Sequence, residues 1–399
     1  MLHAPDYVRA IAPYQGGKPV SELAREYGLD ESRIVKLASN ENPLGMPQSA
    51  RDAMAAAAAE LARYPDGNGF ALKSAISKRF DLPQEWITLG NGSNDILELA
   101  TRAFVQAGES TVFSAHAFAV YALASQAVGA RSIVVPTLAS GPQAYGHDLD
   151  AMLQAITADT RIVFVANPNN PTGTFLPAAA VERFLDQVPT RVLVVYDEAY
   201  TEYLRPEERP DAFAWVRRFP NLLVSRSFSK AYGLAGLRVG YGVAQPLVTD
   251  LLNRLRQPFN VNLLAQAAAV AALSDGPWLE QAYRANREGM AQLEAGLDAI
   301  GVRWLPSWGN FLLVQVAPPP GSGASASAHS PGVAGDPAMP VYERLLRAGV
   351  IVRPVGNYAL NGWLRVSVGL PEENATFLAA LPAALPAALP AALPAAIGR

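Results

Sequence analysis

The feature that most constrains the fold is an alternation of short apolar runs with segments of helical spacing. The apolar runs predict buried strands and lie at 110–115, 131–136, 161–166, 192–196, 221–225 and 239–244. Between them, segments such as Ala178–Gln187 and Val248–Leu255 carry apolar residues at the spacing of a helix. Strands that alternate with helices predict an α/β fold with a mostly parallel sheet covered on both faces. Ligands bind such sheets at the carboxyl ends of the strands, so polar residues there are candidates for a site.

The pattern changes at about Pro277. A long helical segment leads to three short candidate strands, at 310–316, 350–355 and 363–368. This order predicts a smaller α+β domain after the large one, and 399 residues are enough for both. We therefore divide the chain into an amino-terminal arm, a large domain, a small domain and a tail, at residues 1–45, 46–276, 277–380 and 381–399.

Two segments have low complexity. Residues 317–340 are rich in Pro, Gly, Ser and Ala, which predicts a flexible surface insertion in the small domain. The carboxyl end repeats Leu-Pro-Ala-Ala from Leu381 to Ala396. A proline at every fourth residue removes backbone donors that a helix needs, so we expect this tail to be poorly ordered and without regular helix.

Composition argues against several classes of function. Hydrophobic residues make up 50% and charged residues 17%, so a sizeable core can form, and the net charge of −3 argues against nucleic-acid and membrane-surface partners. The absence of cysteine excludes disulfides, thiolate metal sites and a cysteine nucleophile, and four scattered histidines lack metal-ligand spacing. The sequence has neither the start of a signal peptide nor an apolar run that could span a bilayer, so we expect a soluble, cytoplasmic protein without a metal.

The segment around Lys230 offers the first candidate chemistry. The apolar run 222–224 is followed by Ser227, Ser229 and the lysine, and a glycine-rich stretch leads to Arg238. An amine can form an imine with an aldehyde while hydroxyls and a guanidinium hold an anion, so this segment suits an aldehyde that carries a phosphate. A surface lysine in a turn would be the better explanation of an isolated Ser-x-Ser-Lys, and the other segments decide against it.

A glycine-rich turn supplies a second candidate for phosphate binding. It follows the apolar run 86–89, contains Gly92 and Ser93, and precedes a helix that is expected to begin near Asn94. Glycine lets the backbone approach an anion, and the free N–H groups of a first helical turn point toward it. A tight turn without a ligand would show the same pattern, so this motif alone is weak.

Two further strand ends carry polar groups. Asn170 lies in the sequence Asn-Pro-Asn-Asn-Pro-Thr-Gly, where it could donate to a phenolic oxygen, although a plain loop explains the prolines and glycine. Asp197 follows the apolar strand 192–196, and a carboxylate there is costly unless it is paired. Opposite a pyridine nitrogen it would keep that nitrogen protonated, while a helix cap or an ion pair is the alternative. Tyr200 could reach the same phenolic oxygen as Asn170.

Together, and in this order, the motifs resemble the class II branch of the fold-type I aminotransferases, which use pyridoxal 5'-phosphate. The resemblance extends from about Val8 to Leu378, without the insertion and the tail. It implies a large domain with a mostly parallel sheet of the seven-stranded type and a smaller α+β domain. It implies that the catalytic residues are Lys230, which binds the cofactor covalently and moves a proton, Asp197 and Tyr200. The implied cofactor-binding residues are Gly92, Ser93, Asn94, Phe118 (against the ring, where many relatives have tyrosine), Asn170, Asp197, Tyr200, Ser227, Ser229, Lys230 and Arg238.

Within this branch the chain is most similar to the histidinol-phosphate aminotransferases. The similarity lies in IAPYQGGKP (11–19), VKLASNENPLG (35–45), RYPDG (63–67), IVRPV (351–355) and WLRVSVGLPEEN (363–374). It implies a homodimer in which Tyr64 reaches the partner's site, and a substrate site formed by Tyr14, Asn42, Tyr64, Asn170, Arg353 and Arg365. From the residues alone, Arg365 could instead be a solvent-facing charge on a strand, and the two tyrosines could simply pack against the body.

The resemblance implies a transaminase with ping-pong kinetics. Glutamate would give its amino group to the cofactor and leave as 2-oxoglutarate, and imidazole acetol phosphate would then become L-histidinol phosphate, in histidine biosynthesis. An aromatic amino-acid aminotransferase and a threonine-phosphate decarboxylase remain alternatives. A non-catalytic ligand-binding regulator is a further alternative, but such proteins carry an amino-terminal DNA-binding domain, for which the similarity leaves no room.

Overall fold

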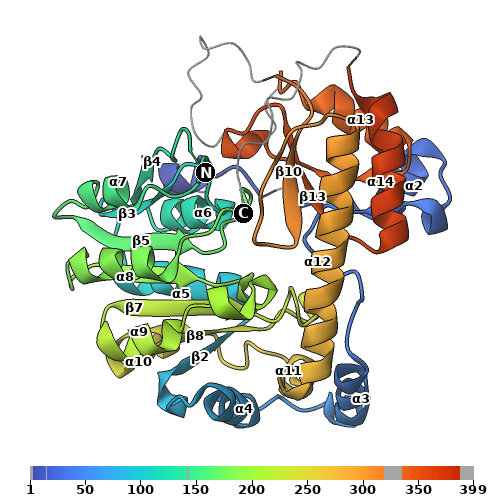
Figure 1. Ribbon diagram of the computed structural model, residues 1–399. Helices are drawn as coiled ribbons and strands as arrows, with labels where there is room; N and C mark the ends of the chain where they lie inside the picture. Colours follow the sequence, from blue (N-terminus) through green and yellow to red (C-terminus); the bar gives the residue numbers. More distant parts are fainter. Residues whose placement is uncertain (1–2, 15, 142, 319–334, 387–399) are drawn as a thin grey trace.

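The computed structural model describes residues 3–14, 16–141, 143–318 and 335–386. Its largest element is a seven-stranded sheet of order β2-β8-β7-β6-β5-β3-β4 (Figure 1). The strands are β2 (Ile87–Gly90), β3 (Ser110–Ser114), β4 (Arg131–Val135), β5 (Thr160–Ala166), β6 (Leu193–Asp197), β7 (Leu222–Ser227) and β8 (Gly240–Ala244). All neighbouring pairs are parallel except the two that involve β8, which runs antiparallel to β2 and β7. The predicted mostly parallel sheet is therefore confirmed.

Helices cover both faces of this sheet. Along β5, Ile162 and Phe164 belong to one apolar cluster, whereas Val163 and Val165 belong to another on the opposite face. Because successive side chains of a strand point to opposite faces, a strand covered on both faces has a continuous apolar sequence, as observed here. The helices of this domain are α3 (Gln48–Ala57), α4 (Phe70–Phe80), α5 (Ser93–Phe104), α6 (Ala119–Ala127), α7 (Leu149–Gln154), α8 (Ala178–Gln187), α9 (Ala212–Arg218), α10 (Pro246–Leu255) and α11 (Leu263–Ser274).

Side-chain caps set the junction between the two domains. Asn262 accepts a hydrogen bond from the Ala265 amide (2.8 Å) at the start of α11. Asp275 accepts one from the Trp278 amide (3.1 Å) at the start of α12 (Gly276–Ala299), where Pro277 occupies the first turn. Such caps satisfy amides that have no partner inside the helix. The break between α11 and α12 therefore lies close to the predicted boundary, and α12 continues into the small domain (Figure 1).

The small domain contains a four-stranded antiparallel sheet of order β12-β13-β10-β9. Its strands are β9 (Trp304–Leu305), β10 (Phe311–Gln315), β12 (Arg353–Pro354) and β13 (Trp363–Ser367), and its helices are α12, α13 (Met339–Arg347) and α14 (Pro371–Ala384). The arm contributes α1 (Asp6–Arg9), α2 (Val20–Tyr27) and β1 (Val35–Lys36), which pairs in parallel with β11 (Val350–Ile351). The end of the arm therefore packs against the small domain. None of the described helices combines the length and the hydropathy required to cross a bilayer.

The predictions for the two low-complexity segments need correction at their edges. The expectation of no helix in the tail is wrong for residues 381–384, because α14 continues through Pro382 to Ala384. Leu381 and Ala384 are buried in the small-domain core, and Arg344 donates to the Ala384 carbonyl at the end of the helix. This packing and the cap stabilise the last turn despite the donor that Pro382 lacks. Ala338, at the end of the predicted insertion, is also buried. Residues 319–334 of the predicted insertion and residues 387–399 of the predicted tail lie outside the described residues.

Candidate active site

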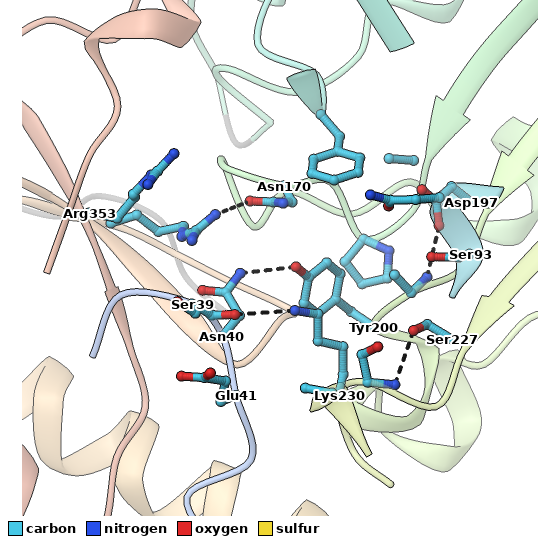
Figure 2. A pocket seen from close by; sticks show the side chains of 18 of the residues that line it. Ser39, Asn40, Glu41, Ser93, Asn170, Asp197, Tyr200, Ser227, Lys230 and Arg353 are labelled. Carbon is cyan, nitrogen blue, oxygen red and sulfur yellow. Dashed lines mark hydrogen bonds between the residues drawn. The ribbon is translucent and has the colours of Figure 1, made fainter. Parts of the chain in front are cut away.

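A cavity of about 260 Å³ lies where the large sheet, the small domain and the arm meet. Thirteen predicted site residues line it, namely Tyr14, Ser93, Asn94, Phe118, Asn170, Asp197, Tyr200, Ser227, Ser229, Lys230, Arg238, Arg353 and Arg365. Figure 2 shows Lys230 and Tyr200 facing Ser39 and Asn40 of the arm, with Asp197 and Ser93 on the large-domain side. Residues that are distant in the sequence thus form one site at the carboxyl ends of the central strands.

Asp197 ends β6 in a buried position. Its Oδ2 accepts a hydrogen bond from the Tyr121 hydroxyl (2.8 Å), and its Oδ1 accepts one from the Ala199 amide (3.2 Å). Burial nevertheless raises the pKa of the Asp197 carboxyl to about 6. A cation beside this carboxylate would offset the loss of water, and a protonated ring nitrogen has the required charge.

Lys230 follows β7 and is enclosed by the pocket. Its Nζ donates to the Ser39 carbonyl (3.2 Å) and lies 5.7 Å from the centre of the Tyr200 ring. Burial, and after it the charge of Arg365, lowers the pKa of the Lys230 amine to about 8. The neutral amine is therefore more populated near neutral pH than that of an ordinary lysine, and it is the form that attacks an aldehyde.

The first turn of α5 and the loop after β7 form an anion-binding cup. Arg238 Nη1 donates to Ser229 Oγ (3.3 Å), and the Ser229 amide donates to Ser227 Oγ (3.0 Å). Gly92 has a φ of 85°, and a Cβ there would lie 2.4 Å from Arg238 Nη2. Gly92 thus permits the close approach of the guanidinium, and the amides of Ser93 and its successors are the free donors of a helix start. Hydroxyls, amides and a guanidinium together fit a phosphate group.

Two arginines form the other end of the pocket. Arg353 and Arg365 are directly opposite each other across β12 and β13, and both are buried. Arg365 donates to Asn170 Oδ1 (2.6 Å) and to the Ala38 carbonyl (2.8 Å), while the Arg353 guanidinium lies 5.5 Å from the centre of the Tyr14 ring. Burial, and the charge of Arg353, lower the pKa of Arg365. Like charges directly opposite on a sheet are unfavourable, so this pair fits a substrate anion.

Asn40 takes the place in the pocket that we predicted for Asn42. The Asn42 side chain accepts from the Leu44 amide (3.0 Å) in a local turn and donates to the Ala231 carbonyl (2.9 Å), so it ties the arm to the segment that follows Lys230. Asn40 lines the pocket and donates to the Tyr200 hydroxyl (2.9 Å). Both asparagines belong to the motif VKLASNENPLG (35–45), and only the conformation of the arm determines which side chain enters the pocket.

Tyr121 is a second residue that the sequence analysis missed. It follows the predicted ring-stacking residue Phe118 by three positions, and the two rings form a T-shaped, edge-to-face pair with centres 5.9 Å apart. The Tyr121 ring also stacks on Phe164 (4.7 Å) beneath Asp197. An aromatic residue at this helical spacing was the available signal, because residues three apart lie on one face of a helix.

Besides Asn42, two predicted residues lie outside the pocket of their own chain. Gly92 lies next to the anion-binding cup, where its lack of a side chain makes room for Arg238. Tyr64 is 82% exposed, and its ring stacks on that of Phe259 with centres 4.7 Å apart. In the described part of the chain, no group of three or more His, Asp or Glu side chains is placed to hold a metal ion.

Comparisons with known proteins identify the family of this chain. The family described as aminotransferase class I and II matches residues 32–381. Histidinol-phosphate aminotransferase 2 of Ralstonia nicotianae is 63% identical over 94% of this chain and 96% of the relative, and histidinol-phosphate aminotransferase 2 of Pseudomonas aeruginosa is 56% identical over 94% and 95%. The crystal structure of histidinol-phosphate aminotransferase from Sinorhizobium meliloti in complex with pyridoxal-5'-phosphate superposes with a TM-score of 0.83 at 27% identity, over 96% of this chain and 98% of that one. The chain therefore belongs to the class I and II aminotransferases and, within them, to the histidinol-phosphate aminotransferases.

Proposed function

We propose that this protein is a pyridoxal-phosphate-dependent transaminase. It interconverts L-histidinol phosphate and 2-oxoglutarate with imidazole acetol phosphate and L-glutamate, in histidine biosynthesis. The observation that carries the proposal is a single pocket that joins the Lys230 amine and the Asp197 carboxylate to the opposed pair Arg353 and Arg365. The first two groups suit the cofactor, and the arginines suit an anionic substrate.

The described residues fit this cofactor from one end to the other. Its phosphate fits the cup beside Gly92, its ring nitrogen fits Asp197, and its phenolic oxygen fits Asn170 and Tyr200. Phe118 lines the same cavity and offers an apolar ring face. When bound, the cofactor supplies an electron sink that stabilises negative charge on the substrate carbon. The protein supplies the positions of the groups and the proton transfers.

Lys230 is the residue that we assign to proton transfer. Its pKa of about 8 allows Nζ both to hold and to release a proton near neutral pH. With the cofactor and a substrate bound, the free Lys230 amine would accept the proton of the substrate Cα and pass it on to the cofactor. The Ser39 carbonyl, which accepts a hydrogen bond from Nζ, holds the amine on the side of the arm.

The arginine pair serves both half-reactions. Glutamate brings a carboxylate and histidinol phosphate brings a phosphate, and the planar guanidinium of Arg365 or Arg353 can bind either anion with two hydrogen bonds. Because the two substrates use the same positions, the first product must leave before the second substrate binds. Ping-pong kinetics follow.

The substrate assignment can be tested directly with the purified holoenzyme. It is offered L-histidinol phosphate, phenylalanine or threonine phosphate, each with and without 2-oxoglutarate, and the products are identified. We expect turnover of histidinol phosphate that depends on 2-oxoglutarate, with glutamate as co-product. Preference for phenylalanine would indicate an aromatic aminotransferase, and carbon dioxide from threonine phosphate would indicate a decarboxylase.

We also propose a homodimer in which each Tyr64 completes the partner's site. Tyr64 stacks on the exposed Phe259, and Leu61 and Phe70, which are near it in the sequence, are also large exposed apolar side chains (Phe259, Leu61 and Phe70 are 44%, 53% and 62% exposed). Burial of such a group against a second copy is favourable. Mixing the Lys230→Ala and Tyr64→Ala variants gives hybrid dimers with one intact site if Tyr64 acts across the interface. Activity that reappears on mixing supports this, and activity that stays at the level of the separate variants argues against it.

A further inference from the structure

Asn40 lies in an irregular segment of the arm, yet both its backbone and its side chain form hydrogen bonds with distant residues. It is 1% exposed and has a φ of 54°, in the left-handed region that residues other than glycine rarely adopt. Its amide N–H donates to Ser367 Oγ (2.8 Å), and its carbonyl accepts from Asn310 Nδ2 (3.0 Å). A strained conformation that is fixed by several partners is typical of a functional position.

The hydroxyl of Ser367 sets the orientation of the Asn40 side chain. Ser367 Oγ accepts from the Asn40 amide and donates to Asn40 Oδ1 (3.0 Å). With Oδ1 facing the serine, Nδ2 faces Tyr200 and donates to its hydroxyl (2.9 Å, Figure 2). A phenol has one proton and accepts through its lone pairs. Because Asn40 Nδ2 already donates to the Tyr200 hydroxyl oxygen, the hydroxyl proton of Tyr200 remains available to donate to another acceptor in the pocket.

We propose that Asn40 is a positioning residue that makes Tyr200 a hydrogen-bond donor toward the cofactor, and that Ser367 fixes its direction. The inference rests on the proposed contact between Tyr200 and the phenolic oxygen of the cofactor. Burial raises the pKa of Tyr200 to about 12, so the phenol keeps the proton that it must donate.

The same arrangement connects Tyr200 to the substrate arginine. Arg365 and Ser367 are two apart on β13 and therefore point to the same face of the small sheet. Arg365 donates to the Ala38 carbonyl while Ser367 bonds to Asn40, so one strand face holds both ends of the segment 38–40. The direction of the Tyr200 proton is thus set from the small domain, although the tyrosine itself belongs to the large one.

The test measures the pH midpoint of the visible absorbance of the bound cofactor, without substrate. Loss of a donor to the phenolic oxygen leaves its negative charge less stabilised, so the protonated form of the bound cofactor is favoured and the midpoint rises. We expect a rise of about one pH unit for Tyr200→Phe. We expect a smaller rise for Asn40→Gly and for Ser367→Ala. Glycine adopts the left-handed conformation without strain, so Asn40→Gly removes the side chain and leaves the backbone as it is.

The double variant decides whether Asn40 acts through Tyr200. In the Tyr200→Phe background, Asn40→Gly should add no further shift of the midpoint. A midpoint that Asn40→Gly leaves unchanged, or a shift of the same size in both backgrounds, would overturn the proposal. If Tyr200→Phe leaves the absorbance midpoint unchanged, both the proposed contact between Tyr200 and the cofactor and the inference about Asn40 are wrong. Failure to turn over histidinol phosphate would instead reject only the substrate assignment, because the midpoint is measured without substrate.

A matched control is Asn221→Gly. Asn221 precedes β7 at the end of the sheet remote from the pocket, and its Nδ2 donates to the Val192 carbonyl (2.8 Å). This variant also loses a side-chain hydrogen bond, so it should lower the melting temperature of the cofactor-free protein and leave the absorbance midpoint unchanged. Comparison of the melting temperatures then separates general loosening of the fold from the specific effect on Tyr200.

Discussion

Asp197 and Ser227 end strands that are buried along their whole length, whereas Arg353 lies on a two-residue strand and Asn40 on an irregular segment. The wall of the pocket that comes from the large domain is thus anchored in a seven-stranded sheet. The opposite wall is assembled from the arm and from the short strands of the small domain. Both walls are buried, but they differ in how many regular elements support each functional group.

The difference in structural support between the two walls matches the two tasks proposed for them, which are binding the cofactor and binding the substrates. Groups for the cofactor should stay fixed through both half-reactions, and the ends of central strands provide that rigidity. Groups for the substrate must accept a carboxylate and a phosphate in turn, so a wall supported by fewer elements suits them. We therefore expect substitutions in the large-domain wall to affect the cofactor and the chemical step, and substitutions of the two arginines in the opposite wall to affect mainly substrate affinity. Asn40 and Ser367 are the exceptions in the opposite wall, because they act on Tyr200.

The largest effect is expected for Lys230→Ala. This change removes both the covalent link to the cofactor and the proton carrier, so kcat should fall by about 10⁴-fold or more. The visible absorbance of the bound cofactor should change in the same variant, while the cofactor-free protein should unfold at a similar temperature. Steady-state kinetics and absorbance spectra check this. Retention of both activity and wild-type colour would refute the assignment of the lysine.

Arg365→Lys tests the substrate-binding role of the wall formed by the arm and the small domain. Lysine keeps the charge but lacks the planar fork that binds an anion with two hydrogen bonds. We expect KM for glutamate and for histidinol phosphate to rise together, by about 10–100-fold, with a smaller change in kcat. Arg303→Lys is the control, because Arg303 lies in the same domain outside the pocket, beside Trp363. A rise of KM for only one of the two substrates would contradict a shared anion site.

Gly92→Ala should lower the affinity for the cofactor and leave the substrate-binding arginines unchanged. The new Cβ would displace the Arg238 guanidinium, so the dissociation constant of the cofactor should rise by about tenfold. Gly108→Ala is a matched control, because Gly108 has a similar φ of 89° and open space around its Cβ position. Equilibrium titration of the cofactor-free variants measures the effect. Equal losses in both variants would assign it to backbone strain alone.

The smallest effect concerns the rate at which the cofactor-free protein captures pyridoxal phosphate. The neutral Lys230 amine is the reacting form and its pKa is lowered to about 8, so the rate should rise with pH and level off above about pH 8. After burial, Arg365 is the main cause of that lowering, so Arg365→Gln should move the midpoint upward by less than about one pH unit. Stopped-flow absorbance follows the reaction. A midpoint near that of an ordinary lysine in the unsubstituted protein would contradict a lowered pKa for Lys230.

The two walls also differ in how well the sequence predicts them. Lys230, Ser227 and Ser229 lie in one short motif at a strand end, so local pattern is enough to place them together. Asn40 and Asn42 occupy one motif as well, but the hydrogen bonds to Ser367 and Tyr200 decide which one reaches the pocket. Those partners are distant in the sequence, and no local spacing encodes them.

Long-range packing explains the other differences. Pro382 predicts the end of a helix by its missing donor, yet the burial of Leu381 in the small-domain core keeps it helical. Likewise, Tyr121 appears from the sequence to be a core aromatic residue, and only the end of β6 beside it gives its hydroxyl a role. Alternation of strands and helices determines the large sheet well, because each strand carries its own signal.

The opposition of Arg353 and Arg365 across β12 and β13 has a practical consequence for assays. Two buried positive charges at one position favour any small anion that reaches them. If the pair binds the substrates as proposed, we expect inorganic phosphate or sulfate in the buffer to compete with both the amino donor and the phosphorylated substrate. Apparent affinities measured in such buffers would be lowered for both substrates, and buffers with bulky or uncharged components would give values closer to the intrinsic ones.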